Sequence, residues 1–553
     1  MPLGDASASQ TALPRVAMLQ MNSIVGAVDA NCQRILTAMA AVDPAADIVL
    51  LPEMVVTGYP LEDLALRPSL QQASIKSVHS LAAALAERGH GHRAVVIGHV
   101  GAALSLVGGR PAPTNCASVL FQGEVIATYA KRHLPNYGVF DEYRNFTPGS
   151  DITVFNVAGA KVGIAICEDL WQASALMADY RAAGVQLLLV PNASPFERDK
   201  DDVRTTLVSQ RAREVGCPIV YVNSVGGQDE LVFDGGSFAV DARGIVTARM
   251  PQFAEASITL DEHLSAPQAP PTADIEQVWN AIVLGIKDYV HKNGRTSVAL
   301  GVSGGIDSAL VAALACDALG ANNVYGVSMP SRFSSEHSRD DAAELAQRTG
   351  MHIRTIDVEP MIQEFTERLS LKDLAAENVQ ARVRGTTLMA ISNSEGHLVL
   401  ATGNKSELAC GYSTVYGDTV GAFAPIKDVF KVDVWALARW RNEHAERTGQ
   451  TPPIPVNSIE KEPSAELRPD QRDTDSLPAY NLLDAVLAAY VERDVDPDSL
   501  VASGFDQDLV SRVVLMVDAA EWKRRQYPPG PKVSRLAFGR DRRLPISARP
   551  PHG

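Results

Sequence analysis

The sequence contains no long apolar run. A membrane-spanning helix needs about 20 consecutive, mostly apolar residues, and polar or charged residues interrupt every stretch of that length in the 553-residue chain. Residues 1–14 also lack the basic start and apolar centre of a signal peptide, and we expect them to be a flexible N-terminus. These absences predict a cytoplasmic protein with no membrane partner.

Cysteine is scarce and scattered. The six cysteines form no C-x-x-C pair; they lie at positions 32, 116, 167, 217, 316 and 410. This spacing excludes a disulfide framework and indicates no structural zinc site. It is typical of a protein from a reducing compartment.

Basic residues are outnumbered. The chain has 50 Lys and Arg against 65 Asp and Glu, which gives a formal net charge of −15 at pH 7. A protein that binds nucleic acid by neutralising many phosphates needs the opposite balance, so we expect no nucleic-acid partner. A small phosphorylated ligand stays compatible with this charge, because a local backbone loop can hold it.

Two common nucleotide-binding motifs are missing, the loop that ends in Gly-Lys-Ser/Thr and the G-x-G-x-x-G fingerprint. In their place stands TSVALGVSGGIDSALVAALA, residues 296–315. Its first part predicts a buried strand and its second part a helix that begins near Asp307 and Ser308. The glycines between them let the backbone approach a ligand, and the helix start offers free N–H groups. The segment therefore predicts a phosphate-binding loop, although an ordinary strand–turn–helix junction has a similar composition.

The first half alternates strand-like and helix-like segments, as layered α/β domains do. Three of its predicted strands run into reactive side chains: Glu53, Lys131 and Cys167. Alone, each has an ordinary explanation as a helix-starting acid, a surface cation or a buried thiol. Together they supply a base for the thiol proton, a cation for the oxyanion and a nucleophile. The set predicts catalysis by a cysteine.

Three prolines among small residues mark an extended connector at residues 262–273. It separates a predicted domain of residues 15–261 from one of residues 274–553. Asp274 is expected to cap a helix over residues 275–292. Predicted strands and helices then alternate, which favours a doubly wound parallel sheet with helices on both faces and the phosphate loop after its first strand.

The last of these predicted strands ends in the polar block TGNKSE, residues 402–407. Such a strand end suits nucleotide hydroxyls and phosphates. Mg²⁺ usually takes one or two carboxylates together with phosphate oxygens, and Asp307 with Glu407 can supply them. The block ENVQARVRG predicts an amphipathic helix that carries Asn378 on one face and Arg384 on another.

LPEMVVTGYP, KRHLPNYGVFDE and GIAICEDLW resemble the three motif blocks of the nitrilase superfamily, over roughly the first 260 residues. The resemblance is strongest to the glutamine amidase branch, and it implies an α-β-β-α sandwich. It implies that Cys167 is the nucleophile, Glu53 the general base and Lys131 the cation beside the oxyanion. Glu142 matches a second family glutamate that orients the site.

The same resemblance points to residues that hold glutamine. Tyr137 corresponds to one such position, and the segment SPFERDK, which starts at Ser194, corresponds to another. Of the two cations in this segment, Arg198 and Lys200, we prefer Lys200 as the glutamine contact.

SGGIDS resembles the pyrophosphate loop of the ATP pyrophosphatases, which split ATP into AMP and pyrophosphate. Together with ENVQARVRG, TGNKSELACGYSTVYGD, PSAELRPDQRDTDSLPAY and EWKRRQYPPG it resembles the NAD synthetases over most of residues 296–531. This resemblance implies deamido-NAD contacts at Asn378, Glu407 and Lys523. It implies ATP contacts at Gly301, Val302, Ser303, Gly304, Gly305, Ile306, Asp307, Ser308 and Thr402.

With both halves combined, the chain resembles the glutamine-dependent NAD synthetases. The resemblance implies a ligase that converts ATP, deamido-NAD, glutamine and water into AMP, diphosphate, NAD and glutamate, the last step of NAD biosynthesis. It also implies Mg²⁺ as cofactor and a homo-oligomer. Three alternatives stay open: an amidotransferase for another adenylated acid, an amidase with a regulatory ATP domain, and a nucleotide sensor with inactive sites.

Overall fold

The computed structural model describes residues 13–548. These residues form two compact units, one of residues 13–228 and 233–272, the other of residues 229–232 and 273–548. Residues 1–12 of the predicted flexible N-terminus lie outside the described part. Between residues 13 and 548, no helix has both the length and the apolar character that crossing a membrane requires.

Two six-stranded sheets build the first unit. The first sheet has the order β14 (Ala256–Thr259), β1 (Val16–Gln20), β2 (Ile48–Leu50), β3 (Ala94–Val107), β4 (Arg110–Phe121) and β5 (Glu124–Ala130). The second has the order β13 (Val246–Arg249), β12 (Phe238–Val240), β9 (Ile219–Asn223), β8 (Leu187–Asn192), β7 (Ala160–Ile164) and β6 (Val154–Val157). A separate hairpin joins β10 (Val225–Gln228) and β11 (Leu231–Asp234).

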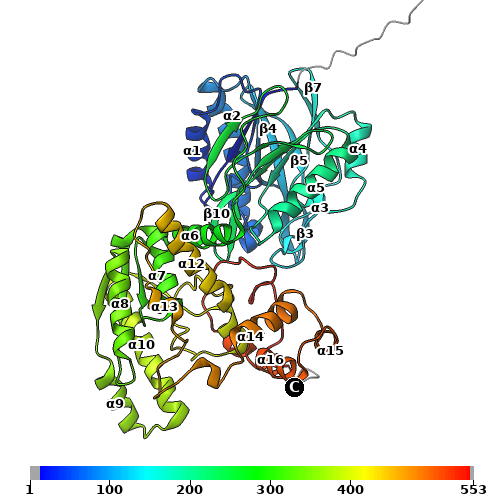
Figure 1. Cartoon of the computed structure of the whole chain (residues 1–553). Coiled ribbons are helices and arrows are strands. Elements are labelled where there is room, and N and C mark those ends of the chain that lie inside the picture. Colours follow the sequence, from blue (N-terminus) through cyan, green and yellow to red (C-terminus); the bar gives the residue numbers. More distant parts are fainter. Residues whose placement is uncertain (1–12, 549–553) are drawn as a thin grey trace, which may run out of the picture. The chain divides into compact units, whose positions relative to one another are not determined.

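The inner strands β1, β2, β8 and β9 are buried along their whole length, which makes the unit a sandwich. Val16 and Met18 of β1 join the core between the sheets, whereas Ala17 and Leu19 point to the opposite face, as successive strand residues must. That outer face packs against α1 (Val28–Met39) and α2 (Pro68–Glu87). The second sheet is covered by α4 (Leu176–Ala182) and α5 (Lys200–Val215), so the predicted α-β-β-α order is confirmed (Figure 1).

Part of the segment expected as a connector is bound to the first unit. The Thr247 hydroxyl donates to the carbonyl of Leu264 at 2.6 Å. The N–H of Ala269 donates to the carbonyl of Arg249 at 2.9 Å. The backbone carbonyl and N–H groups of this proline-containing segment therefore form hydrogen bonds with residues of β13.

The second unit contains a four-stranded sheet in which every pair is parallel. Its order is β17 (His352–Thr355), β16 (Val324–Ser328), β15 (Val298–Gly301) and β18 (Leu398–Leu400). The chain therefore leaves β15 first to one side and later to the other. With right-handed crossovers this reversal places helices on both faces, and the doubly wound sheet predicted from the sequence is confirmed.

The first helix of this unit corrects a prediction about its N-terminus. Ala273 holds the N-cap position of α6 (Asp274–Lys292), so Asp274 is the first helical residue instead of the cap.

The other helices surround the sheet or follow it in the chain. The crossovers contain α7 (Ile306–Leu319), α8 (Glu336–Thr349), α9 (Glu359–Arg368) and α10 (Asp373–Glu395). After β18 follow α11 (Lys405–Cys410), α12 (Lys431–Arg447), α13 (Val456–Glu460), α14 (Tyr480–Leu487), α15 (Pro497–Ala502), α16 (Gln507–Ala519) and α17 (Glu521–Arg524). α14 and α16 form an apolar core of their own with α11.

Candidate active sites

In the first unit, the predicted carboxylate and ammonium meet. Lys131 directly follows β5, and Glu53 follows β2 by three residues. The Lys131 ammonium donates to Glu53 Oε1 at 2.8 Å, and both side chains are 1% exposed. A buried charge needs a charged partner, so this pair defines a dry, ionic centre.

Glu142 adds a second carboxylate to the same ammonium. Lys131 Nζ lies 3.0 Å from each Glu142 oxygen, and the Tyr59 hydroxyl donates to Glu142 Oε1 at 2.9 Å. Burial raises the pKa of Glu142 to about 7, against the opposing charge of Lys131. Burial disfavours the Lys131 ammonium, but Glu142 and Glu53 outweigh it and raise the lysine pKa well above its ordinary value. The lysine is therefore a fixed cation.

Cys167 occupies a sharp turn between β7 and the short helix α3 (Glu168–Trp171). Its φ angle of +42° lies in the left-handed region, where a non-glycine residue is strained and often functional. Burial, followed by the charge of Glu53, raises the pKa of the Cys167 thiol well above its ordinary value. The thiol is therefore protonated at rest, so a reaction that uses it as a nucleophile needs a base.

The three residues expected to hold glutamine lie on separate segments of the first unit. The Tyr137 hydroxyl donates to Glu168 Oε2 at 2.9 Å, next to the cysteine in sequence. Ser194 is buried just after β8. Lys200 is the first residue of α5. Of these positions, Tyr137 is about half exposed (52%), as a residue at the entrance of a site would be.

Sequence patterns missed two donors to the Glu53 carboxylate. Asn115 Nδ2 donates to Glu53 Oε1 at 2.7 Å, and the Ala193 N–H donates to Oε2 at 2.9 Å. Asn115 gave only a weak signal, since the strand β4 also contains the polar residues Thr114 and Ser118. The Ala193 contact gave none, because a backbone group leaves no trace in the residue type.

Glu142 should give glutamine hydrolysis a pH dependence. Its raised pKa means that it loses its proton between about pH 6 and 8. The ionised form adds negative charge beside the centre that is expected to receive the thiol proton, which favours that transfer. We expect the native kcat to rise through this window. In Glu142→Gln the rise should disappear, and the rate at pH 8 should fall about tenfold. Measuring kcat against pH for the two proteins tests this.

Tyr59→Phe is the matched variant for that profile. Its hydroxyl stabilises the ionised form of Glu142, so losing it should move the rise to higher pH without removing it. A native profile that is flat between pH 6 and 8, or an unchanged slope in Glu142→Gln, would contradict the assignment.

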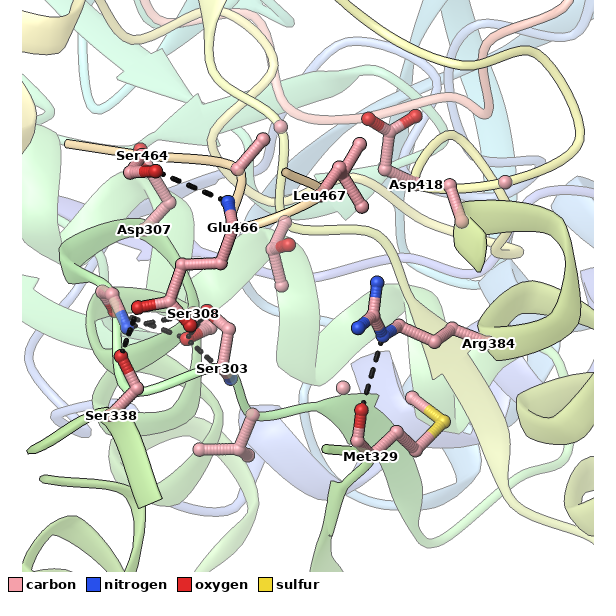
Figure 2. A pocket seen from close by; sticks show the side chains of 18 of the residues that line it. Ser303, Asp307, Ser308, Met329, Ser338, Arg384, Asp418, Ser464, Glu466 and Leu467 are labelled. Carbon is pink, nitrogen blue, oxygen red and sulfur yellow. Dashed lines mark hydrogen bonds between the residues drawn. The ribbon is translucent and has the colours of Figure 1, made fainter. Parts of the chain in front are cut away.

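In the second unit, the predicted nucleotide residues surround one cavity of about 320 Å³. It lies at the carboxyl ends of β15, β16 and β18, where the strand order reverses and open α/β sheets bind ligands. Figure 2 shows Ser303 and Ser308 on one side of it and Arg384 with Asp418 on the other. Its lining includes all predicted ATP residues except Gly304, together with Glu407.

The phosphate loop is held by its own serines. The Gly305 N–H donates to Ser303 Oγ at 3.2 Å, and the Ser308 hydroxyl donates to the Gly305 carbonyl at 3.1 Å. Gly304 has a φ of +78°, and a Cβ there would lie 2.2 Å from the carbonyl oxygen of Ser338 on α8. Only glycine fits at this position, because it faces α8 at close range instead of the cavity.

The acidic pair predicted for Mg²⁺ converges on a lysine. The Lys431 ammonium donates to Asp307 Oδ2 and lies 3.6 Å from Glu407 Oε1. Asn404 Nδ2 donates to the other Asp307 oxygen at 2.9 Å. Burial and the charge of Asp307 raise the pKa of Glu407 to about 8. One ammonium therefore leaves this carboxylate pair short of positive charge.

Two predicted deamido-NAD residues lie outside the cavity lining. Asn378 Oδ1 accepts a hydrogen bond from the Thr414 hydroxyl at 2.7 Å. Lys523 Nζ donates to the carbonyls of Gly411 and Ser413 at 2.7 and 2.8 Å. Both side chains therefore hold residues 411–414, a loop whose Ser413 lines the cavity.

Comparison with known proteins matches both halves. The family model "Carbon-nitrogen hydrolase" covers residues 15–267, and "NAD synthase" covers residues 278–527. The glutamine-dependent NAD(+) synthetase of Xanthomonas campestris pv. campestris is 45% identical over 96% of this chain and 97% of its own. That of Acinetobacter baylyi is 41% identical over 96% and 98%. The chain belongs to the glutamine-dependent NAD⁺ synthetase family.

Solved structures agree with this membership. A glutamine-dependent NAD⁺ synthetase from Acinetobacter baumannii, in complex with ADP, matches with a TM-score of 0.75 and 39% identity over 96% of this chain and 98% of that one. The enzyme from Cytophaga hutchinsonii matches with a TM-score of 0.82 over 97% and 98%. At 22% identity the latter supports the fold alone.

For this NAD⁺ synthetase, the sequence predictions missed polar residues of the second cavity. Lys431, Arg384, Asp418 and Asp473 all line it. Lys431 lies in the first turn of α12, where the helix dipole disfavours a cation, and that position was a usable signal. Arg384 donates to the Met329 carbonyl at 3.1 Å. The sequence placed Arg384 on a different face of this helix from Asn378, and no nucleotide contact was predicted for it.

Proposed function

We propose that the first unit of this NAD⁺ synthetase releases ammonia from glutamine and that the second unit adds it to deamido-NAD activated by ATP. The carrying observation is that one chain holds both a buried Glu–Lys–Glu centre beside a strained cysteine and a separate phosphate-loop cavity. A glutamine amidase alone would not need the phosphate-loop cavity, and a synthetase that used only free ammonia would not need the cysteine centre.

In the first unit, Cys167 Sγ attacks the side-chain amide carbon of glutamine while Glu53 takes the thiol proton. Lys131, held as a cation by two carboxylates, stabilises the developing oxyanion. Ammonia leaves with a proton returned by Glu53, and water then hydrolyses the thioester to glutamate. Glu142 fixes the lysine. Tyr137, Ser194 and Lys200 bind glutamine.

In the second unit, the loop from Gly301 to Ser308 and Thr402 bind ATP. The nicotinate carboxylate of deamido-NAD attacks the α-phosphorus, and pyrophosphate leaves. Ammonia displaces AMP from the resulting acyl-adenylate and forms the amide. Lys431 and Arg384 line the cavity, and their positive charges would stabilise the negative charge of the phosphates. Glu407 contacts deamido-NAD directly, whereas Asn378 and Lys523 act on it through the loop they hold.

Asp307 and Glu407 fit Mg²⁺ as a pair. The two carboxylates share the Lys431 ammonium, and burial followed by the charge of Asp307 raises the pKa of Glu407 to about 8. Within residues 13–548 no three His, Cys, Asp or Glu side chains gather as metal ligands, so phosphate oxygens of ATP would complete the coordination. A bound Mg²⁺ would neutralise charge on the leaving pyrophosphate.

A mass balance tests the reaction. Purified protein with Mg²⁺, ATP, deamido-NAD and glutamine should form NAD, AMP, pyrophosphate and glutamate in equal amounts, quantified by chromatography. Omitting deamido-NAD should stop AMP formation. Glutamine loss without ATP consumption would favour an amidase with a regulatory ATP domain, and AMP formation with another acid in place of deamido-NAD would favour a different amidotransferase.

We further propose that the chain assembles into a homo-oligomer and works in the cytoplasm with small-molecule substrates only. The acidic net charge of −15 supports the lack of a nucleic-acid partner. The family resemblance is the support for self-assembly.

A further inference from the structure

A buried ion pair lies in the first unit outside the residues assigned so far. Arg204 of α5 donates to Asp234 Oδ1, at the end of β11, over 2.8 Å, and the side chains are 1% and 0% exposed. The pair contacts neither Cys167 nor Lys131 by hydrogen bond or ion pair among residues 13–548. Its effect on the site therefore has to pass through other groups.

Asn223 connects the pair to the predicted glutamine contact. Its amide nitrogen donates to the Gly235 carbonyl at 3.1 Å and lies 3.4 Å from Asp234 Oδ1. The same side chain takes hold of both backbone groups of Ser194: its Oδ1 accepts from the N–H at 2.9 Å, and its Nδ2 donates to the carbonyl at 3.1 Å. The Asn223 amide therefore connects Asp234 of the ion pair to the backbone of Ser194.

The segment of Ala193 and Ser194 also reaches the base. The Ala193 N–H donates to Glu53 Oε2 at 2.9 Å, while Lys131 and Asn115 donate to Oε1. A shift of this segment would change both a glutamine contact and the orientation of the carboxylate that takes the thiol proton. The two effects are tied together because the residues are adjacent in the chain.

The pair is poorly arranged for stability alone. Arg204 Nε and Nη1 are buried and find no hydrogen-bond acceptor among residues 13–548. Unpaired buried donors and a desolvated ion pair both oppose folding, and an apolar replacement of such a pair is often neutral or stabilising. A role in positioning accounts for a charge pair at this place better than a role in holding the fold.

We propose that the Arg204–Asp234 pair, acting through Asn223, positions the Ala193–Ser194 segment and so sets glutamine affinity and the alignment of Glu53. The inference rests on the proposed glutaminase function of the first unit. Arg204 and Asp234 are positioning residues, since neither touches the reacting atoms.

The test uses the full-length protein and three variants. Arg204→Met breaks the pair, Arg204→Met with Asp234→Asn replaces it by a neutral pair that leaves no buried charge alone, and Arg204→Lys keeps the cation. The readouts are KM and kcat for glutamine hydrolysis, with ammonium-dependent NAD formation by the second unit as the internal measure of intact protein. Arg93→Met is the matched control, because Arg93 is another buried arginine of the first unit whose Nε lacks an acceptor among the described residues.

We expect the neutral double variant to raise KM for glutamine about tenfold or more and to lower kcat, with an unchanged ammonium-dependent rate. Arg204→Lys should recover part of the KM effect, and Arg93→Met should keep the native KM. A native KM in the folded double variant would overturn the proposal, as would an unfolded first unit in that variant, since the pair would then serve the fold. Failure of the native protein to hydrolyse glutamine would instead reject the proposed function.

Discussion

Replacing Cys167 by alanine is expected to lower glutamine-dependent NAD formation by at least about 10³-fold, since the covalent step loses its nucleophile. NAD formation from added ammonium should stay within about twofold of the native rate, because the second unit needs only the ammonia. Alanine tolerates the φ of +42° at this position as well as cysteine does, so the backbone should not change. Parallel assays with glutamine and with ammonium chloride measure both effects.

Cys217→Ala provides the matched control. This thiol is also buried in the first unit, 2% exposed, and burial raises its pKa to about 12. It lies in the apolar core between the second sheet and its helices, so its loss should reduce stability by about 1 kcal/mol and leave both rates unchanged. Equal activity losses in the two variants would mean that packing, not nucleophilicity, explains the Cys167 effect.

The second large effect is expected at Gly304. An alanine Cβ would overlap the Ser338 carbonyl at 2.2 Å, and neither backbone can give way without moving the phosphate loop. We expect Gly304→Ala to lower NAD formation at least about 100-fold with glutamine or with ammonium, because misplaced donors no longer match the phosphates. Glutamine hydrolysis in the first unit should continue. Isothermal titration of ATP should show the lost binding directly.

Gly320→Ala separates the clash from backbone strain. Gly320 follows α7 with a φ of +80°, close to the +78° of Gly304, but no atom lies within 4 Å of its Cβ position. Both variants place an L residue at a positive φ, and each should lose at least about 1–2 kcal/mol of stability from that backbone strain. If Gly320→Ala lost ATP binding to the same degree, the close approach to α8 would not be the reason for the Gly304 effect.

The three main residues of the first site could be predicted from the sequence, because each of them follows a predicted strand. Glu53, Lys131 and Cys167 each follow a strand whose apolar residues are unmistakable. The contacts that align them could not be predicted. Ala193 acts through its N–H, and the Arg204–Asp234 contact joins residues 30 positions apart. Such pairings depend on how the strands pack.

The second site shows a similar limit. The doubly wound parallel sheet, the glycine-containing loop after β15 and the helix that follows it were predicted, since periodicity and glycines indicate them, whereas the order of the strands was not predicted. The shape of the cavity was not predicted either, because its far wall comes from loops without periodicity. Asn378 and Lys523 illustrate this, as both are occupied by backbone carbonyl or hydroxyl groups of residues 411–414. Asp274 shows the smaller error of one residue at a helix end.

The acidic residues around Lys431 have a consequence for which form of the nucleotide is the substrate. Asp307 and Glu407 contact the Lys431 ammonium, and the charge of Asp473 also acts on it. A divalent ion carried by the nucleotide would offset the carboxylate charge that the phosphates of a free nucleotide would meet there. With Mg²⁺ at the proposed site, we expect only the chelated nucleotide to be the substrate, so the ratio of metal to total nucleotide would set the concentration of usable substrate.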